Sequence, residues 1–146
     1  MIFRPDGTLD LHIAESSFKP GDVVAGRVKL SLSKPVKARR LVVSLIGEEW
    51  VYITCGGGKS RTVYEKNIRL HDESIELSGE VTYRAVEKDF QFKLQATAQP
   101  TILLMPETFG SRIEHMEGTG LRWIVEVKLD IPLGKDMNAE QEIFVS

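Results

Sequence analysis

The order of apolar and polar residues predicts a protein built from strands. Along residues 27–32, Val28, Leu30 and Leu32 alternate with basic or hydroxyl side chains. An extended chain places successive side chains on opposite faces, so this period of two predicts a strand with one buried face. No segment shows the 3.6-residue apolar spacing of an amphipathic helix. The same alternation recurs over residues 9–13, 90–96 and 123–131.

Further strands are predicted by composition, and turn residues separate them. Residues 38–54 and 60–70 are rich in the β-branched and aromatic side chains that favour strands. Pro20-Gly21 predicts a tight turn before the strand at 23–32, because proline presets φ and glycine accepts a positive φ. Breaks or turns are also expected at 33–35, 71–74, 78–79 and 87–89, and a last short strand at 142–145.

This succession of strands and turns predicts a fold class. It favours an all-β, immunoglobulin-like antiparallel β-sandwich of two stacked sheets. The length of 146 residues fits one domain spanning residues 1–146. Residues 98–120 are the least regular part, with a short buried strand expected at 101–105. Residues 106–120 show no strand period, and long connections of this kind are often functional.

Composition and charge narrow the function classes. The formal net charge is −2, which gives no overall attraction to nucleic acid, so no nucleic-acid partner is expected. Cys55 is the one cysteine, which excludes an intrachain disulfide and favours a reducing compartment. The first residues lack the apolar run of a signal peptide, and no window is apolar enough to span a membrane. We therefore expect a cytoplasmic protein.

Four ordered segments resemble the N-terminal domain of arrestin-like proteins. Residues 18–28 carry an aromatic residue, then Pro-Gly-acidic, then Gly-x-Val. Residues 33–47 are similar to the Pro-Val-Lys segment of that family and its following Leu-x-Gly strand. Residues 90–94 resemble its Phe-x-Phe-x-Leu strand, and residues 122–132 resemble the strand near the end of the domain. The order and spacing match over nearly the whole chain.

The resemblance implies a sandwich fold and a role in binding or scaffolding without catalysis. The family includes animal arrestins, arrestin-domain-containing trafficking adaptors, the retromer cargo subunit and bacterial sporulation-control proteins. Its members usually have two such sandwiches. The chain has no Pro-Pro-x-Tyr motif, so recruitment of a ubiquitin ligase by that motif is not implied. Its first strand carries Asp10 and His12 and no lysine pair, so phosphate sensing is not carried over.

A dense basic cluster is the candidate binding site. It consists of Lys34, Lys37, Arg39 and Arg40. Such a cluster fits contact with an anion, an acidic peptide or a lipid headgroup. The alternative is a charged strand end that discourages edge-to-edge aggregation.

Other chemistry-bearing residues give weaker signals. Gly58-Lys59-Ser60 imitates the end of a phosphate loop, but Ile53 stands where the pattern needs glycine, so a hairpin tip is the better interpretation. Cys55, beside three glycines, fits either a reactive thiol or an ordinary loop cysteine. His12, His71 and His115 could serve metal or acid–base chemistry if they converge, or be surface histidines.

The paired acidic residues do not predict a catalytic pair. Glu48-Glu49, and Glu140 with Glu142, have no separation across a cleft that sequence could define, and a solvated rim is the better interpretation. No cofactor is expected.

Two function hypotheses follow. The first is a non-catalytic interaction module that binds a protein partner, either as an extended peptide added to a sheet edge or as a second copy of itself. Membrane contact is expected only through a protein or a lipid headgroup, if at all. The alternative is a small-molecule-binding protein or enzyme with a site in the 106–120 loop.

Overall fold

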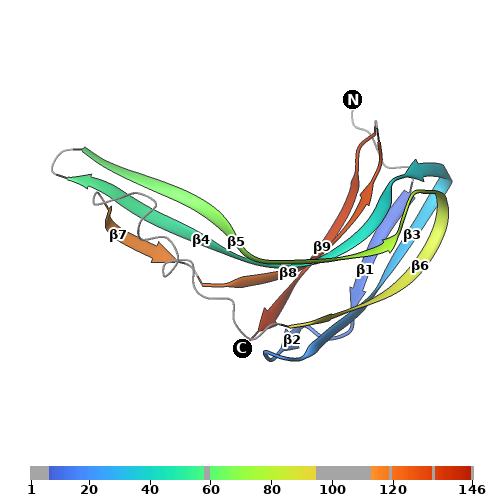
Figure 1. Cartoon of the computed structure of the whole chain (residues 1–146), viewed down its shortest axis with the longest axis horizontal. Coiled ribbons are helices and arrows are strands. Elements are labelled where there is room, and N and C mark those ends of the chain that lie inside the picture. Colours follow the sequence, from blue (N-terminus) through green and yellow to red (C-terminus); the bar gives the residue numbers. More distant parts are fainter. Residues whose placement is uncertain (1–6, 58–59, 95–112, 119, 133, 146) are drawn as a thin grey trace.

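The strands form two sheets. The computed structural model describes residues 7–57, 60–94, 113–118, 120–132 and 134–145. The strands are β1 (Gly7–Ile13), β2 (Ser17–Phe18), β3 (Val23–Ala38), β4 (Arg40–Gly57), β5 (Ser60–Ser78), β6 (Val81–Lys93), β7 (Ile113–Gly118), β8 (Arg122–Asp130) and β9 (Met137–Val145). The smaller sheet has the order β1-β3-β6, and the larger has the order β2-β9-β8-β4-β5, with β7 also paired to β4. Figure 1 shows these strands as a curved body from which β4 and β5 extend to the left.

The core lies between the two sheets, and the period of two predicted it. Val28 and Leu30 of β3 are fully buried, and so are Leu41 of β4 and Val127 of β8. The remaining buried residues of this core include Val24, Val43, Leu45, Phe90, Phe92, Val125 and Leu129. Two sheets that bury one face each in this way form a sandwich. The predicted all-β sandwich of two stacked sheets is therefore confirmed.

The turn before β3 is closed by the residues that predicted it. Asp22 N donates to the Lys19 carbonyl over 3.0 Å, and Gly21 has a φ of 91°. These features, with Pro20 at the second position, define a type II turn, in which the third residue needs a positive φ. Gly21 N also donates to the Leu94 carbonyl (2.9 Å), and Leu94 N donates to the Asp22 carbonyl (2.8 Å). The turn is thus tied to the chain just after β6.

Gly26 is required by the packing of an aromatic ring. It lies directly opposite Phe90 of β6 and Ile13 of β1. A Cβ at this position would lie 2.5 Å from Phe90 Cζ and 2.8 Å from the backbone oxygen of His12. The ring of Phe90 therefore occupies the space that any larger residue would need. This contact explains the glycine of the Gly-x-Val motif.

We expect Gly26→Ala to destabilise the fold by about 1–3 kcal/mol, because Phe90 or the β1 backbone must move to admit the methyl group. Denaturant unfolding followed by tryptophan fluorescence measures this change. Gly79→Ala is the matched control, since its Cβ would meet only Glu76 Oε1 at an ordinary 3.6 Å. Equal stability losses in the two variants would contradict the packing argument.

Three expected breaks are wrong. β3 continues through Pro35, and only its pairing with β6 is interrupted, between Ser31 and Val36. A strand tolerates proline at such an irregularity because no ladder hydrogen bond is lost. Residues 71–74 belong to β5, and residues 87–89 belong to β6.

Cross-strand partners explain why these polar segments are extended. Arg27 of β3 forms ion pairs with Glu87 (3.0 Å) and Asp89 (2.9 Å), so the charged residues of β6 meet opposite charges on the next strand. Ser74 Oγ lies 2.8 Å from Ser44 Oγ across the β4–β5 pair. A polar run is therefore no sign of a turn when one sheet face is open to water.

The predicted division near residues 78–79 is confirmed. β5 ends at Ser78 and β6 begins at Val81. The buried Tyr83 hydroxyl donates to the Gly79 carbonyl over 2.8 Å and closes this connection.

The strands after residue 112 differ from the expectation. The final strand is longer than the predicted 142–145, since it begins at Met137. Residues 113–118 form a strand, although the sequence predicted no strand period there. The predicted buried strand at 101–105 lies outside the described residues.

Within the described residues, we find no helix of the length and apolar character needed to cross a bilayer.

Candidate functional site

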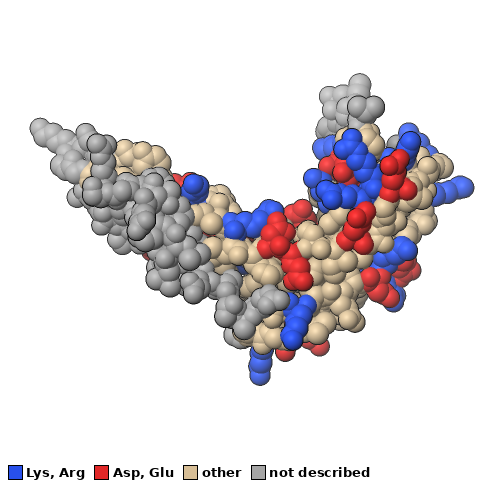
Figure 2. All heavy atoms as spheres, in the orientation of Figure 1, with Lys and Arg blue, Asp and Glu red and all other residues tan. Residues whose placement is uncertain are grey.

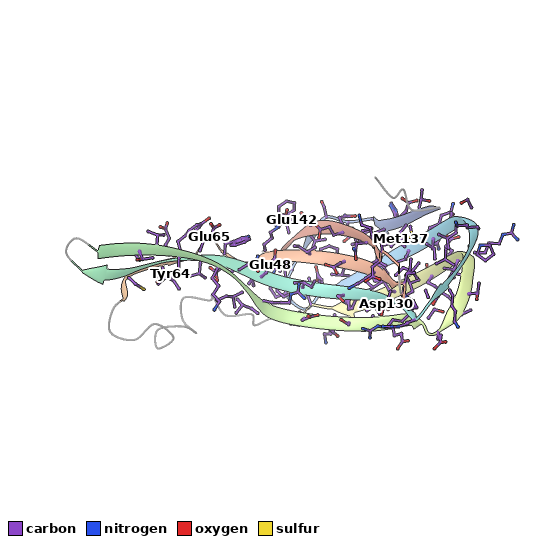
Figure 3. The ribbon with its side chains drawn as sticks, turned by 90° about the horizontal axis from the view of Figure 1, so that it is seen from above. Glu48, Tyr64, Glu65, Asp130, Met137 and Glu142 are labelled. Carbon is purple, nitrogen blue, oxygen red and sulfur yellow. The ribbon has the colours of Figure 1, made fainter. Side chains whose placement is uncertain are left out.

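The β4–β5 hairpin extends beyond the sandwich as an arm. Its paired residues run from Glu48 opposite Arg69 to Gly57 opposite Ser60. On the other side of β4, β8 pairs with residues 40–48 and β7 pairs with residues 51–55. In Figure 3 the labelled Tyr64 and Glu65 lie on this arm, far from Asp130 and Met137 at the opposite end of the body. We call residues 49–57 of β4 with 60–69 of β5 the arm.

The arm has a small apolar core of its own. Val51, Ile53 and Cys55 of β4 are buried, and Ile68 of β5 packs against them. This cluster is separate from the core between the sheets. A two-stranded hairpin by itself is marginally stable in water. The buried cluster therefore contributes to the stability of the arm.

A bulge marks the base of the arm. Gly47 pairs with His71 while Glu48 pairs with Arg69, so Leu70 is an extra residue in β5. An extra residue bends the strand and increases its twist. The ring of Trp123 packs here, since a Cβ on Gly47 would lie 3.3 Å from two of its carbons. The His71 ring lies against the same indole, with centroids 5.3 Å apart.

Large apolar side chains are exposed on the arm. The exposed fraction is 65% for Val63, 45% for Tyr64, 39% for Trp50 and 37% for Tyr52. Trp50 and Tyr52 lie opposite Asn67 and Glu65, so they share one sheet face with them. The Tyr52 hydroxyl donates to Glu65 Oε1 over 3.4 Å. Val63, opposite Thr54, lies on the same face, whereas Tyr64, opposite Ile53, lies on the other. Exposed apolar residues rimmed by polar ones are typical of an interaction surface.

The outer edge of β5 is the other notable feature. β5 is 19 residues long and ends the larger sheet, with β4 as its one neighbour among the described strands. An edge strand presents N–H and C=O groups that another extended chain can pair with. Charged residues of both signs lie along it: Glu65, Lys66, Arg69, Asp72, Glu73 and Glu76.

The predicted basic cluster lies at the junction of β3 and β4. Lys34, Lys37, Arg39 and Arg40 are all exposed, and the first two lie in β3. Arg40 Nε lies 3.8 Å from Asp130 Oδ2, and Arg39 acts electrostatically on Asp136. The structure therefore sets carboxylates beside Arg39 and Arg40. Figure 2 shows basic and acidic side chains interspersed over this side of the body.

Asp136 is held in its charged form near this cluster. Its pKa is lowered, chiefly because Ile131 N donates to Oδ1 over 2.8 Å, and further by Lys128 Nζ, 3.3 Å from Oδ2. A carboxylate whose pKa falls on folding stabilises the fold above its unfolded pKa of about 4. That stabilisation is lost as the pH falls toward the lower folded value.

We expect Asp136→Ala to lower the free energy of unfolding by about 1.5–3 kcal/mol at pH 7, the usual contribution of a hydrogen bond to a charged group. The difference from the unchanged protein should shrink as the pH is lowered below 4. Urea unfolding at several pH values measures it, with the exposed Glu80→Ala as control. A deficit that is the same at every pH would contradict this account.

The candidate catalytic and metal-binding residues do not converge in the described structure. His12 lies in β1 of the smaller sheet and His71 in β5 of the larger. The side chain of His115 lies outside the described part. Among the side chains that are described, no group of three His, Cys, Asp or Glu residues could hold a metal ion.

The paired acidic residues have structural contacts. Arg122 bridges Glu48 (3.8 Å) and Glu142 (3.4 Å) across the sheet. Glu49 is buried and accepts a hydrogen bond from Gly120 N over 3.1 Å. Glu140 lines a shallow, open depression of about 350 Å³ with three neighbours on β8 and β9. The predicted solvated rim thus holds for Glu140, whereas Glu49 is an interior residue.

The strands change the interpretation of Cys55 and agree with the interpretation of Gly58-Lys59-Ser60 as a hairpin tip. Cys55 is a buried residue of β4, so the loop cysteine expected from sequence is wrong, and its thiol packs in the arm core. Gly58-Lys59-Ser60 joins β4 to β5, although residues 58–59 lie outside the described structure. A connection between two strands offers no helix N-terminus for a phosphate.

The overall architecture matches a solved protein. The fold is similar to that of Spo0M, a sporulation control protein from Bacillus subtilis, with a TM-score of 0.62 and 18% sequence identity. The chain has an arrestin-like fold. The similarity covers 98% of this chain and 50% of Spo0M, so this arrestin-like chain spans about half the length of that protein. No family model and no curated protein matches it by sequence.

Sequence reasoning missed the most distinctive surface of this arrestin-like chain, the edge of β5 that has no neighbouring strand in the described structure. The expectation of a turn at 71–74 divided β5 into two short strands and hid its length. The apolar and β-branched residues of 60–70 did indicate a strand there. Its position at the end of the sheet depends on the strand order, for which a single sequence holds no local signal.

Proposed function

We propose that this arrestin-like chain is a non-catalytic interaction module that binds an extended protein segment along the outer edge of β5. The observation that carries this proposal is the position of β5 at the end of the six-stranded sheet, with 19 residues and no neighbour on its outer side in the described structure. Main-chain pairing supplies affinity in such sites, and alternate side-chain contacts supply specificity.

The arm supports this choice of surface. Val63 is 65% exposed and lies opposite Thr54, on the sheet face that also carries Trp50 and Tyr52. A segment added beside β5 would cover Val63 and extend the sheet. The proposal assigns no catalytic residue and no cofactor.

The basic cluster, Lys34, Lys37, Arg39 and Arg40, stays a second candidate contact, for an acidic segment. Asp130 and Asp136 offset part of its charge, so we rank it below β5. The partner's identity and a cytoplasmic location are likewise proposals. The alternative of a small-molecule site in the 106–120 loop gains no support from the described part of that loop, which is a strand at 113–118.

Proline scanning of the edge tests the proposal. The probe is a displayed library of random peptides of about 12 residues selected for binding to the protein, long enough to contain a strand of the usual length of about 3–10 residues. Val63→Pro and Tyr64→Pro each remove one N–H. Successive residues of an edge strand direct their N–H groups to opposite sides, so one variant loses a β4 hydrogen bond and the other an outward donor.

We expect the variant that lacks the outward donor to stay folded by circular dichroism and to bind selected peptides about tenfold more weakly or worse. Val63→Ala, which keeps its N–H, is the matched control and should bind within about threefold of the unchanged protein. Selection of no peptides, or of peptides insensitive to both prolines, would refute edge binding at β5.

A further inference from the structure

We infer that the edge of β5 pairs with the same edge of a second copy of this chain, antiparallel, about a two-fold axis at Asn67. This inference rests on the proposed function, since it names the extended segment that β5 binds. It is carried by the arrangement of charges on β5 together with the position of that strand in the sheet.

Symmetry restricts the registers that two copies can adopt. A two-fold interface brings the same patch of both chains together. When the paired edges continue one sheet, the axis passes through a residue that faces its own copy. Residues equally far on either side of it then lie opposite each other, and opposite residues share a sheet face.

An axis at Asn67 places opposite charges together twice. Glu65 of each copy lies opposite Arg69 of the other. Within one chain, these two residues and Asn67 already share one face of the sheet, because they lie opposite Tyr52, Glu48 and Trp50 of β4. The same register sets Lys66 opposite Ile68, on the other face. Over residues 65–69 of the two copies, this register opposes no two residues of like charge.

Neighbouring registers lack this match. An axis at Glu65, Lys66 or Arg69 opposes that charge to its own copy, which is unfavourable. An axis at Ile68 brings Lys66 opposite Leu70, the extra residue of the bulge. An axis at Tyr64 opposes no acidic residue to a basic one between Thr62 and Lys66. Among axes from Tyr64 to Arg69, charge thus favours the Asn67 register. An axis at Val63 would bring Glu65 opposite Arg61, and Arg69→Glu, which that axis leaves without effect, distinguishes the two registers.

Existing contacts leave both charged groups able to engage a second copy. Arg69 Nη1 lies 3.2 Å from Asp72 Oδ2, and the side chain of Arg69 is 53% exposed. A guanidinium has five donors, so Arg69 can hold Asp72 and a second carboxylate together. Glu65 is exposed and accepts a long hydrogen bond (3.4 Å) from the Tyr52 hydroxyl.

The bulge limits the length of the pairing. Leu70 interrupts the regular alternation of β5, so regular pairing about Asn67 covers residues 65–69 of each copy. Val63, exposed in the single chain, comes next to the bulge of the other copy. A short paired stretch with two ion pairs fits a reversible, salt-sensitive dimer rather than an obligate one.

Charge reversal tests the register directly. Sedimentation equilibrium over a range of protein concentrations at low salt measures the dimer dissociation constant. Glu65→Arg opposes two arginines, and Arg69→Glu opposes two glutamates, so we expect each to raise that constant about tenfold or more. The double variant E65R/R69E restores opposite charges and should return it to within about threefold of the unchanged protein.

The control is Glu80→Arg, an exposed reversal in the connection between β5 and β6, which should leave dimerisation unchanged. Circular dichroism and thermal unfolding establish that each variant is folded. Recovery in the double variant supports the Asn67 register. Single variants that dimerise normally, or a double variant as weak as the singles, overturn it.

The outcome also separates this inference from the proposed function. A chain that is monomeric at all concentrations but binds displayed peptides at β5 overturns the self-pairing and leaves edge binding in place. A chain that neither dimerises nor binds peptides at β5 overturns both. A dimer that responds to the charge swap as expected supports both, since the bound segment is then β5 itself.

Discussion

Main-chain pairing along β4 is the constraint on which the rest of the structure depends. This strand is bonded to β5 over its whole length on one side, and on the other to β8 and then β7. Because its first half supplies Leu41, Val43 and Leu45 to the sandwich core, the body fixes the direction of the arm. The second half then carries Val51, Ile53 and Cys55 into a separate cluster.

The bulge at Leu70, near Gly47, separates the part of the hairpin that packs in the sandwich core from the part that forms the arm. In the body, β5 has Ile75 and Leu77 packed against the common core, so one of its faces is committed. Before Leu70, on the arm, the strand lies away from that core, and its outer edge and exposed Val63 are the features that another chain could meet. A bulge is a low-cost way to make this change, because it redirects a strand without ending it.

Several charged side chains on this fold are paired with opposite charges on neighbouring strands, and the described ones do not form one large patch of a single sign. Arg27 is matched by Glu87 and Asp89 across β3 and β6, and Arg122 is matched by two glutamates across the larger sheet. With a net charge of −2, the chain offers little long-range attraction to any class of partner. Specificity must therefore come from register and shape at a particular edge, where the order of charges along one strand matters more than their sum.

The sequence by itself determined the fold class, the turn at Pro20-Gly21 and the faces of the main strands. These depend on local backbone preference and on the period of two, which neighbouring residues express directly. The same local rules misjudged residues 71–74 and 87–89, whose polar side chains are extended because partners on adjacent strands satisfy them. They also gave no reason for Gly26, which is explained only by the ring of Phe90 far along the chain.

Only the tertiary structure decided which strand lies at the end of the sheet, how far the arm reaches beyond the core, and which carboxylates offset Arg39 and Arg40. Each of these depends on pairing between segments distant in sequence, and no window of the chain contains both members of such a pair. The fold could thus be anticipated from periodicity and turn chemistry. The edge of β5, where we place the function, could not be, because an edge is defined by the order of strands that are far apart in the sequence.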